Sequence, residues 1–241
     1  MNTNRVEIIR ATTIANNDMN KQLSALYEVN WELLRKTSNK YEAQGYELAN
    51  PYLLATTNAY ASAKIRVMCL GKETMGWGGE FTDQPTIKEL QQLYALYIHQ
   101  EGGNDAAFHR FVGWLSSLSP DVEVIPNNVI KIGKKNTNGY YKVVADELHS
   151  VSHILKEEIS ILKPSVIVCP TSNLYDYNKP LTELLGESAE VVIQQDLFVS
   201  ERRYEAFPNT PFIVCPHPQG KSSENMDKVK QIISCYILKL L

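Results

Sequence analysis

The sequence has no CxxC pair, and its four cysteines, Cys69, Cys169, Cys215 and Cys235, lie far apart. Three of them lie in or beside apolar runs, which predicts buried free thiols. This spacing is not that of a zinc site, an iron–sulfur site or the disulfide framework of a small secreted domain. We therefore expect a reducing compartment, no metal or metal cluster, and no other cofactor.

A surplus of positive charge is also missing, because 24 Lys and Arg stand against 27 Asp and Glu, for a net charge of -3. Proteins that coat nucleic acid nonspecifically displace counterions with many basic residues, so the composition excludes that mode and leaves room only for a local basic loop. No segment approaches the roughly 18 uninterrupted apolar residues of a membrane span, and the N-terminus has no apolar stretch of signal-peptide length. These absences predict a cytoplasmic protein without a membrane partner.

The hydrophobic content of 44% over 241 residues is enough for one full core, so we expect a single domain over 1–241. Apolar residues at spacings of three and four, among them Leu23, Tyr27 and Leu34, predict that 18–60 is mainly helical. This segment would form an N-terminal helical extension over about residues 1–60 that covers the sheet.

Short apolar runs alternate with helical patterns along the rest of the chain. The runs predict strands at 64–70, 122–132, 165–169 and 211–215, with weaker strand signals at 190–194 and 197–206. The patterns predict helices at 86–100, 104–118, 148–162 and 225–240, the second capped by Asn104 or Asp105. This alternation is typical of an α/β fold in which helices cover both faces of a mainly parallel sheet, a three-layer α/β/α architecture.

Three polar segments directly follow predicted strands: Gly71 to Phe81, Asn127 to Lys135, and Pro216 to Lys221. The carboxyl ends of parallel strands meet at one edge of a sheet, where α/β proteins bind ligands, so we expect the three segments to converge. The first carries Glu73, four glycines that let backbone approach a ligand closely, and the aromatic residues Trp77 and Phe81. The second carries an asparagine pair suited to reading a base edge, and the third holds His217 between two prolines.

In their order, these segments resemble those of the uracil-DNA glycosylases, which carry a glycine-led acidic loop, an asparagine-bearing strand and a C-terminal histidine–proline loop. NNVIKIG is similar to the asparagine-valine-valine-lysine segment of the bacterial and archaeal branch, and ILKPSVIVC resembles the segment that follows it in these enzymes. The resemblance touches four short segments over residues 65–221. It implies a central four-stranded parallel sheet between helices, and hydrolysis of the bond that joins a flipped-out uracil to deoxyribose.

The resemblance also implies roles for individual residues. Glu73 would orient water and stabilise the positively charged sugar, and His217 would hydrogen-bond the departing base as negative charge grows on its oxygen. Asn128 would read the pyrimidine edge, and Trp77 or Phe81 would stack on it. The implied phosphate contacts are Lys131, Lys134, Lys135 and Lys221, and the implied substrate contacts from the same motifs are Gly71, Lys72, Thr74, Pro218 and Gln219.

Two departures from the family pattern bear on the substrate. Thr74 and Met75 occupy the positions where the family pattern has a proline and a tyrosine. The resemblance implies that a pocket without this tyrosine also admits thymine. The histidine loop continues as QGKSSEN and lacks the serine and the leucine that some members wedge into the duplex, which disfavours base flipping from double-stranded DNA. The expected partner is therefore single-stranded or damaged DNA, bound by a monomer.

Other interpretations of the same residues remain open. Glu73 could be a solvated loop carboxylate or a helix cap, His217 could cap a turn, and Trp77 and Phe81 could fill the core. The asparagines could satisfy backbone groups at a strand end, and the lysines could belong to an ordinary exposed loop. For the whole chain, the alternatives are a binding module on a glycosylase fold that does not cleave, and a hydrolase of free nucleosides or nucleotides.

Overall fold

The structure, a computed structural model, describes residues 3–74, 76–81, 83–99, 106–137, 151, 153–171, 181–219 and 222–241. The chain forms two compact units that alternate along the sequence. The first, which we call the helical unit, comprises Met1–Ala61, Lys72–Glu101 and Asn128–Leu162. The second, the sheet unit, comprises Ser62–Gly71, Gly102–Asn127 and Lys163–Leu241.

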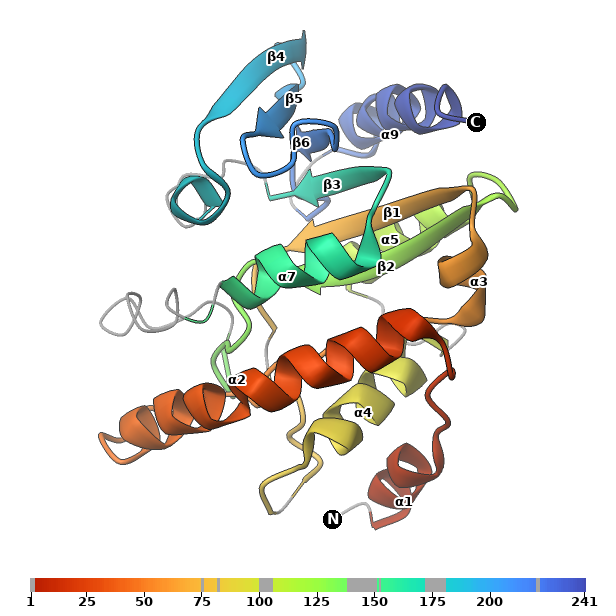
Figure 1. The fold of residues 1–241 in the computed structure, drawn as a ribbon. Helices are drawn as coiled ribbons and strands as arrows, with labels where there is room; N and C mark the ends of the chain where they lie inside the picture. Colours follow the sequence, from red (N-terminus) through yellow and green to blue (C-terminus); the bar gives the residue numbers. More distant parts are fainter. Residues whose placement is uncertain are drawn as a thin grey trace. The chain divides into compact units, whose positions relative to one another are not determined.

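The sheet has six strands in the order β2-β1-β3-β6-β5-β4 (Figure 1). They are β1 (Ile65–Gly71), β2 (Val122–Asn128), β3 (Val166–Pro170), β4 (Ser188–Gln194), β5 (Val199–Tyr204) and β6 (Phe212–Cys215). Strands β1, β3 and β6 run parallel, whereas β5 is antiparallel to both β4 and β6.

The expectation of a four-stranded, mainly parallel sheet is therefore wrong, because the sheet is mixed and has six strands. The two additional strands form the β4–β5 hairpin, which lies between β3 and β6 in the sequence and joins the sheet through β5. The weak strand signals at 190–194 and 197–206 correctly indicated both strands. They did not indicate the sheet that the strands join, because pairing depends on partners distant in sequence.

Helices α5 (Ala107–Ser116) and α9 (Ser223–Leu238) pack against one face of the sheet. Their contacts include Phe111 of α5 and Ile233 of α9 against alternate strand residues such as Val67 and Val168. The intervening residues, such as Met68, are also fully buried, so these strands are covered on both faces. This burial explains why their sequences are continuous apolar runs rather than alternating patterns. The residues proposed to cap α5, Asn104 and Asp105, lie outside the described part of the chain.

The helical unit contains α1 (Thr3–Ala11), α2 (Asp18–Glu42), α4 (Ile87–His99) and α7 (His153–Leu162), and α3 (Asn58–Ser62) lies at its boundary with the sheet unit. Helix α2 begins after Asn17, whose side chain accepts a hydrogen bond from the Asn20 N–H, and it packs against both α4 and α7. Its apolar stripe, which includes Leu23 and Leu34, is buried as its spacing predicts.

The prediction that 18–60 is mainly helical is wrong for residues 43–57, which lie between the end of α2 at Glu42 and the start of α3 at Asn58. Gly45 adopts a left-handed φ of 86°, a conformation typical of the residues that end helices, and Pro51 cannot donate a helical hydrogen bond. Residues 47–52 instead extend along 131–135, with an antiparallel bridge between Leu48 and Lys134. The polar segment 128–135 therefore has an extended neighbour within the helical unit.

None of the helices that the structure describes combines the length and the apolar character that a membrane span requires. The described residues contain no group of three or more His, Cys, Asp or Glu side chains placed to hold a metal ion.

Three of the four cysteines are buried in the sheet unit, and Cys235 is exposed. Burial raises the pKa of the Cys169 thiol to about 12 and raises the pKa values of Cys69 and Cys215 as well, so these groups stay protonated at neutral pH. Thiolates are the reactive form of cysteine. We therefore expect a thiol-titrating reagent at pH 8 to modify Cys235 rapidly in the native protein and the other three only after unfolding. Rapid modification of more than one cysteine would contradict this burial.

Candidate functional site

Strands β1, β3 and β6 all leave the sheet at the same edge, because they run parallel. They end at Gly71, Pro170 and Cys215. Neighbouring strands lie about 4.8 Å apart, so the ends of β1 and β6, with β3 between them, are separated by roughly 10 Å. The strands that precede Glu73 and His217 therefore end at the kind of edge where α/β proteins bind their ligands.

The loop after β6 orients the imidazole of His217. The backbone N–H of Gln219 donates a hydrogen bond to the Nδ1 atom of His217, with an N to N distance of 3.1 Å. A neutral imidazole whose Nδ1 accepts a hydrogen bond carries its proton on Nε2. The half-buried ring thus caps its own turn through Nδ1 and can act as a hydrogen-bond donor through Nε2. The turn-capping interpretation and the chemical one use different ring nitrogens and are compatible.

A groove of about 300 Å³ lies beside this loop in the sheet unit. Its walls include Pro218 of the loop, Arg110 of α5, and Ser223 and Lys230 of α9. Helix α9 begins after Ser222, whose Oγ accepts a hydrogen bond from the N–H of Asn225. The positive end of a helix and two basic side chains together favour an anion, and Asp227 at the same groove limits the net positive charge. This arrangement suits one phosphate group.

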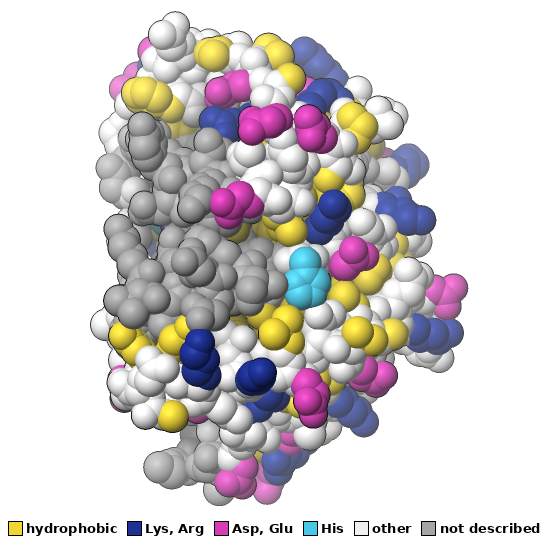
Figure 2. All heavy atoms as spheres, turned by 60° about the vertical axis from the view of Figure 1, so that its left-hand side comes forward, with side chains coloured by type: hydrophobic (Ala, Val, Ile, Leu, Met, Phe, Trp, Pro, Cys, Tyr) yellow, Lys and Arg dark blue, Asp and Glu magenta, His cyan; other side chains and the backbone are white. Residues whose placement is uncertain are grey.

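Sequence reasoning missed Arg110 and Lys230. Each is an ordinary basic residue on an amphipathic helix, and the two are 120 positions apart in the sequence, so only the packing of α5 and α9 on the sheet brings them to one groove. On the face drawn in Figure 2, basic and acidic side chains are interspersed. The described surface on that face therefore favours a local contact with an anion over a broad electrostatic one.

The glycine-rich loop that follows β1 belongs to the helical unit from Lys72 onward. Three backbone hydrogen bonds hold it: Ile130 N–H to Lys72 O, Gly76 N–H to Lys134 O, and Asn50 N–H to Trp77 O, at 2.9, 3.1 and 2.9 Å. Gly76 and Gly78 adopt left-handed φ values of 63° and 73°. A Cβ atom at Gly78 would lie 2.8 Å from the Asn50 side chain. At these two positions a side chain would meet neighbouring protein atoms, which explains two of the four glycines of the loop. The close approach of this loop to a ligand stays a prediction.

Gly133 packs against the backbone of this loop so tightly that a Cβ atom at Gly133 would overlap the carbonyl oxygen of Thr74. Backbone cannot move aside as a flexible side chain can, so Gly133→Ala is expected to lower the free energy of unfolding by about 1–3 kcal/mol. It should also displace the loop that carries Glu73. Urea denaturation measures the stability. The matched control is Gly113→Ala on α5, where a Cβ atom meets nothing within 4 Å and helix propensity predicts equal or higher stability. Equal stabilities of the two variants would contradict the contact.

Trp77 is half-buried and packs edge-to-face against Tyr52, Tyr94 and Tyr97, with ring centroids 4.7, 6.4 and 5.5 Å away. Tyr94 is fully buried, so this aromatic cluster reaches the core of the helical unit. Its packing agrees with the core interpretation of Trp77. Phe81 is also half-buried, and its backbone N–H bonds to the Gly78 carbonyl. Stacking of either ring on a base stays a prediction.

Asn127 and Asn128 end β2 and are both buried. The amide of Asn127 contacts the sulfur of Met68 at 3.7 Å. Asn128 is 6% exposed, and the next residues, 129–133, are buried too. We predicted that Asn128 hydrogen-bonds the edge of a base. Its burial does not test this prediction, since a base flipped into a pocket would also be buried.

Lys131 does not fit the predicted contact with a phosphate, because its side chain is fully enclosed and its ammonium forms an ion pair with Glu158 of α7. Glu158 also accepts a hydrogen bond of 2.7 Å from the hydroxyl of Tyr27, which in turn accepts one of 2.9 Å from the N–H of Leu54. Burial lowers the pKa of Lys131 and Glu158 opposes that shift. The lysine that the sequence assigned to the surface thus belongs to a buried network, which we call the Lys131–Glu158 network.

The remaining predicted residues fall into two groups. In the helical unit, Lys72, Glu73, Thr74 and Lys134 are half-buried and Lys135 is exposed. The Thr74 hydroxyl and the Trp77 indole N–H are buried, and neither has a hydrogen-bond partner within the described parts of the chain, so this loop holds two polar groups that a bound molecule could satisfy. In the sheet unit, Gly71 is buried, Pro218 is half-buried and Gln219 is exposed, and Lys221 lies outside the described residues.

No protein-family model matches the chain, and a search of curated proteins finds no significant match.

Proposed function

We propose that the chain is an N-glycosylase that hydrolyses the bond between deoxyribose and uracil, or another damaged base, in DNA. The observation that carries this proposal is the orientation of His217 at the carboxyl edge of the parallel strands. The hydrogen bond from Gln219 makes Nδ1 an acceptor, so the neutral ring presents Nε2–H as a donor. That donor is the group that a departing pyrimidine anion requires.

The reaction breaks the bond between the sugar C1′ atom and the base nitrogen. The bonding electron pair leaves with the base, where negative charge grows on a carbonyl oxygen, and positive charge grows on the sugar. His217 Nε2–H stabilises the oxygen, since a preoriented dipole needs no reorganisation during the reaction. The resemblance to uracil-DNA glycosylases assigns the support of the sugar cation and the orientation of the water that attacks C1′ to Glu73. The water proton neutralises the base, and the products are the free base and an abasic sugar.

The groove lined by Arg110 and Lys230 supports a substrate that carries phosphates, because it places two basic side chains beside the Pro216–Gln219 loop. A free nucleoside has no group to occupy it. This groove therefore favours a substrate that carries phosphate, an oligonucleotide or a nucleotide, over a free nucleoside.

The proposal is tested by the release of free base from uracil-containing single-stranded and duplex oligonucleotides, and from free deoxyuridine, at low and physiological salt. We expect release from the single strand, weaker release at physiological salt because the phosphate contacts are screened, and none from the nucleoside. Release from deoxyuridine alone would replace the proposal by nucleoside hydrolysis. Binding of the oligonucleotides without release of any base would replace it by a binding module.

A further inference from the structure

The turn that joins β4 and β5 exposes a large aromatic side chain beside the histidine loop. Phe198 is 67% exposed and belongs to the sheet unit. Its backbone N–H donates to the carbonyl of Gln195, and its φ is 55°, in the left-handed region. A bulky residue in this region is strained where Gly or Asn would fit, and an exposed phenyl ring gains little from burial to offset that strain. Folding alone does not explain a phenylalanine at this position.

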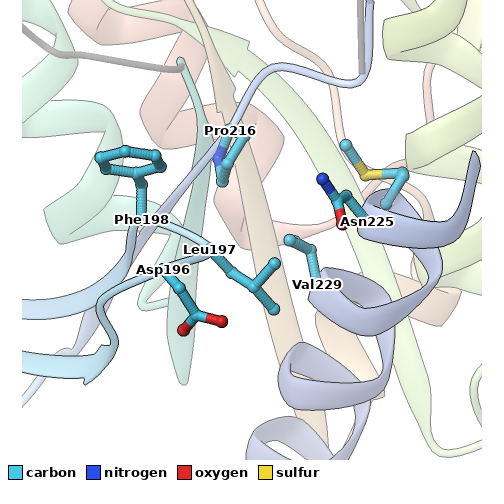
Figure 3. Close-up of a pocket in the computed structure, with 7 residues that line it drawn as sticks. Asp196, Leu197, Phe198, Pro216, Asn225 and Val229 are labelled. Carbon is cyan, nitrogen blue, oxygen red and sulfur yellow. The ribbon is translucent and has the colours of Figure 1, made fainter. Parts of the chain in front are cut away.

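A small recess connects Phe198 to the site. Its volume is about 70 Å³, and its walls include Phe198, Asp196, Pro216 and Asn225. Pro216 directly precedes His217, and Asn225 lies in the first turn of α9. Figure 3 shows the Phe198 ring and Pro216 side by side, the Asn225 amide across the recess, and the Asp196 carboxylate on the opposite side of the turn from the ring. The aromatic side chain of Phe198 and the amide side chain of Asn225 therefore border the same space.

The size of the recess decides what it can bind. Pockets that enclose a small molecule span about 300–1,000 Å³, so a recess of about 70 Å³ cannot enclose one. A flat aromatic group can instead lie on the exposed phenyl ring and present its edge to the Asn225 amide, which both donates and accepts hydrogen bonds. Nucleobases have this combination of a flat face and a polar edge, and stacking on aromatic side chains is the usual way in which proteins hold the bases of single strands.

The basic groove identifies the rest of the ligand. Met226 of α9 lines both the recess at Phe198 and the groove of Arg110 and Lys230, so the two sites are adjacent on the sheet unit. A chain that alternates bases and phosphates fits an aromatic platform next to a basic groove. A membrane or an apolar protein surface would not use the groove.

We propose that Phe198 is a stacking platform for a nucleobase of single-stranded DNA that neighbours the base removed at His217. This inference rests on the proposed function for the identity of the neighbouring base. It assigns the role of holding the strand to the β4–β5 hairpin. It also accounts for the strained φ of Phe198, because strained residues persist where function requires them.

The test compares Phe198→Gly with Phe198→Trp. Glycine removes the ring and fits a φ of 55°, so this variant is expected to fold at least as stably as the wild type. Tryptophan keeps an aromatic face. The matched control is Val192→Ala on the same hairpin, where a side chain that is 60% exposed is shortened.

The probe is a single-stranded oligonucleotide with a stable abasic analogue at the target position and 2-aminopurine, a fluorescent base that is quenched by stacking, next to it. We expect the wild type and Phe198→Trp to quench the probe. Phe198→Gly should lose the quenching and bind at least about tenfold more weakly, the scale of one base–aromatic stack. Val192→Ala should behave as the wild type.

The outcomes separate this inference from the proposed function. Release of uracil by a Phe198→Gly protein whose affinity and quenching are unchanged would overturn the platform and keep the glycosylase. Loss of quenching in Phe198→Gly, with no uracil release by any variant, would keep the platform and overturn the glycosylase. Failure of the wild type to bind the probe, or concentration-dependent self-association that Phe198→Gly abolishes, would overturn the platform in favour of a protein contact.

Discussion

Replacing His217 by alanine is expected to lower the single-turnover rate of base release from a single-stranded uracil oligonucleotide by about 100- to 1,000-fold. This is the range found when one preoriented donor to a developing oxyanion is removed. The side chain donates only in the transition state, where the base oxygen is charged, so the loss should appear in the rate of the chemical step and not in substrate affinity. Rapid-quench measurement of free base at saturating enzyme separates the two.

The hydrogen bond that orients the ring can be tested separately from the ring. Gln219→Pro removes the backbone N–H that donates to Nδ1, whereas Gln219→Ala keeps it, so the ratio of their rates isolates the bond. We expect the proline variant to be slower and His217→Gln to recover part of the loss of His217→Ala, because an amide nitrogen is also a donor. A His217→Ala variant that releases base within a few fold of the wild type would exclude His217 from the chemistry.

Replacing Glu158 by alanine is expected to lower the free energy of unfolding by about 3–5 kcal/mol, because it leaves the ammonium of Lys131 buried without its counter-charge. Glu158 and Lys131 are both fully enclosed. Glu157, the exposed neighbour on α7, provides the matched control, and Glu157→Ala should change stability by less than about 0.5 kcal/mol. Urea denaturation followed by circular dichroism measures both variants.

The double variant Lys131→Met/Glu158→Leu should recover most of the lost stability, since apolar residues of similar volume can replace a buried ion pair. It should fall short of the wild type by about 1–3 kcal/mol, because the Tyr27 hydroxyl would lose its acceptor. A double variant as unstable as Glu158→Ala would show that the loss comes from packing and not from an unpaired charge.

The pH dependence of Glu158→Ala follows from the pKa of Lys131. Burial lowers this pKa in the folded state, and Glu158 counteracts the shift, so removing Glu158 lowers the pKa further. The unfolded chain then binds more protons than the folded one between the lowered pKa and the ordinary lysine pKa, and stability rises with pH across that window. The difference in unfolding free energy between the wild type and Glu158→Ala should therefore become smaller between pH 7 and pH 9.5. A difference in unfolding free energy that stays constant with pH would argue that water reaches Lys131 in the variant instead.

The pattern of apolar residues was sufficient to predict the strands and helices of the sheet unit. The runs IRVMCL and SVIVC are entirely apolar after Arg66 and Ser165, so a strand buried on both faces is the structure that suits them. The stripe on α9, which includes Met226 and Ile233, was equally clear because one helical face carries it. The end of α2 was not predicted, since the apolar residues after Glu42 also occur at spacings that fit a helix and are buried in an extended segment instead.

The candidate site shows a similar division. The order of Glu73, Asn128 and His217 along the chain is visible in the sequence, and the common carboxyl edge of β1 and β6 follows from their parallel pairing with β3. The burial of Lys131 could not be predicted from its own sequence neighbourhood. Glu158 did give a signal, because it lies on the apolar stripe of α7, directly before the buried Ile159, and a buried carboxylate needs a cation as its partner. No pattern in the sequence indicated the groove lined by Arg110 and Lys230.

The residue pattern alone defined local properties, namely which segments are buried strands or amphipathic helices and which polar residues directly follow a strand. These properties depend on side chains a few positions apart, whose periodicity is written in the chain. The folded structure was needed to show that β4 and β5 extend the sheet, that Lys131 is buried against Glu158, and that Phe198 is exposed beside the histidine loop. Each of these depends on contacts between residues far apart in the sequence, which strand and helix patterns do not encode.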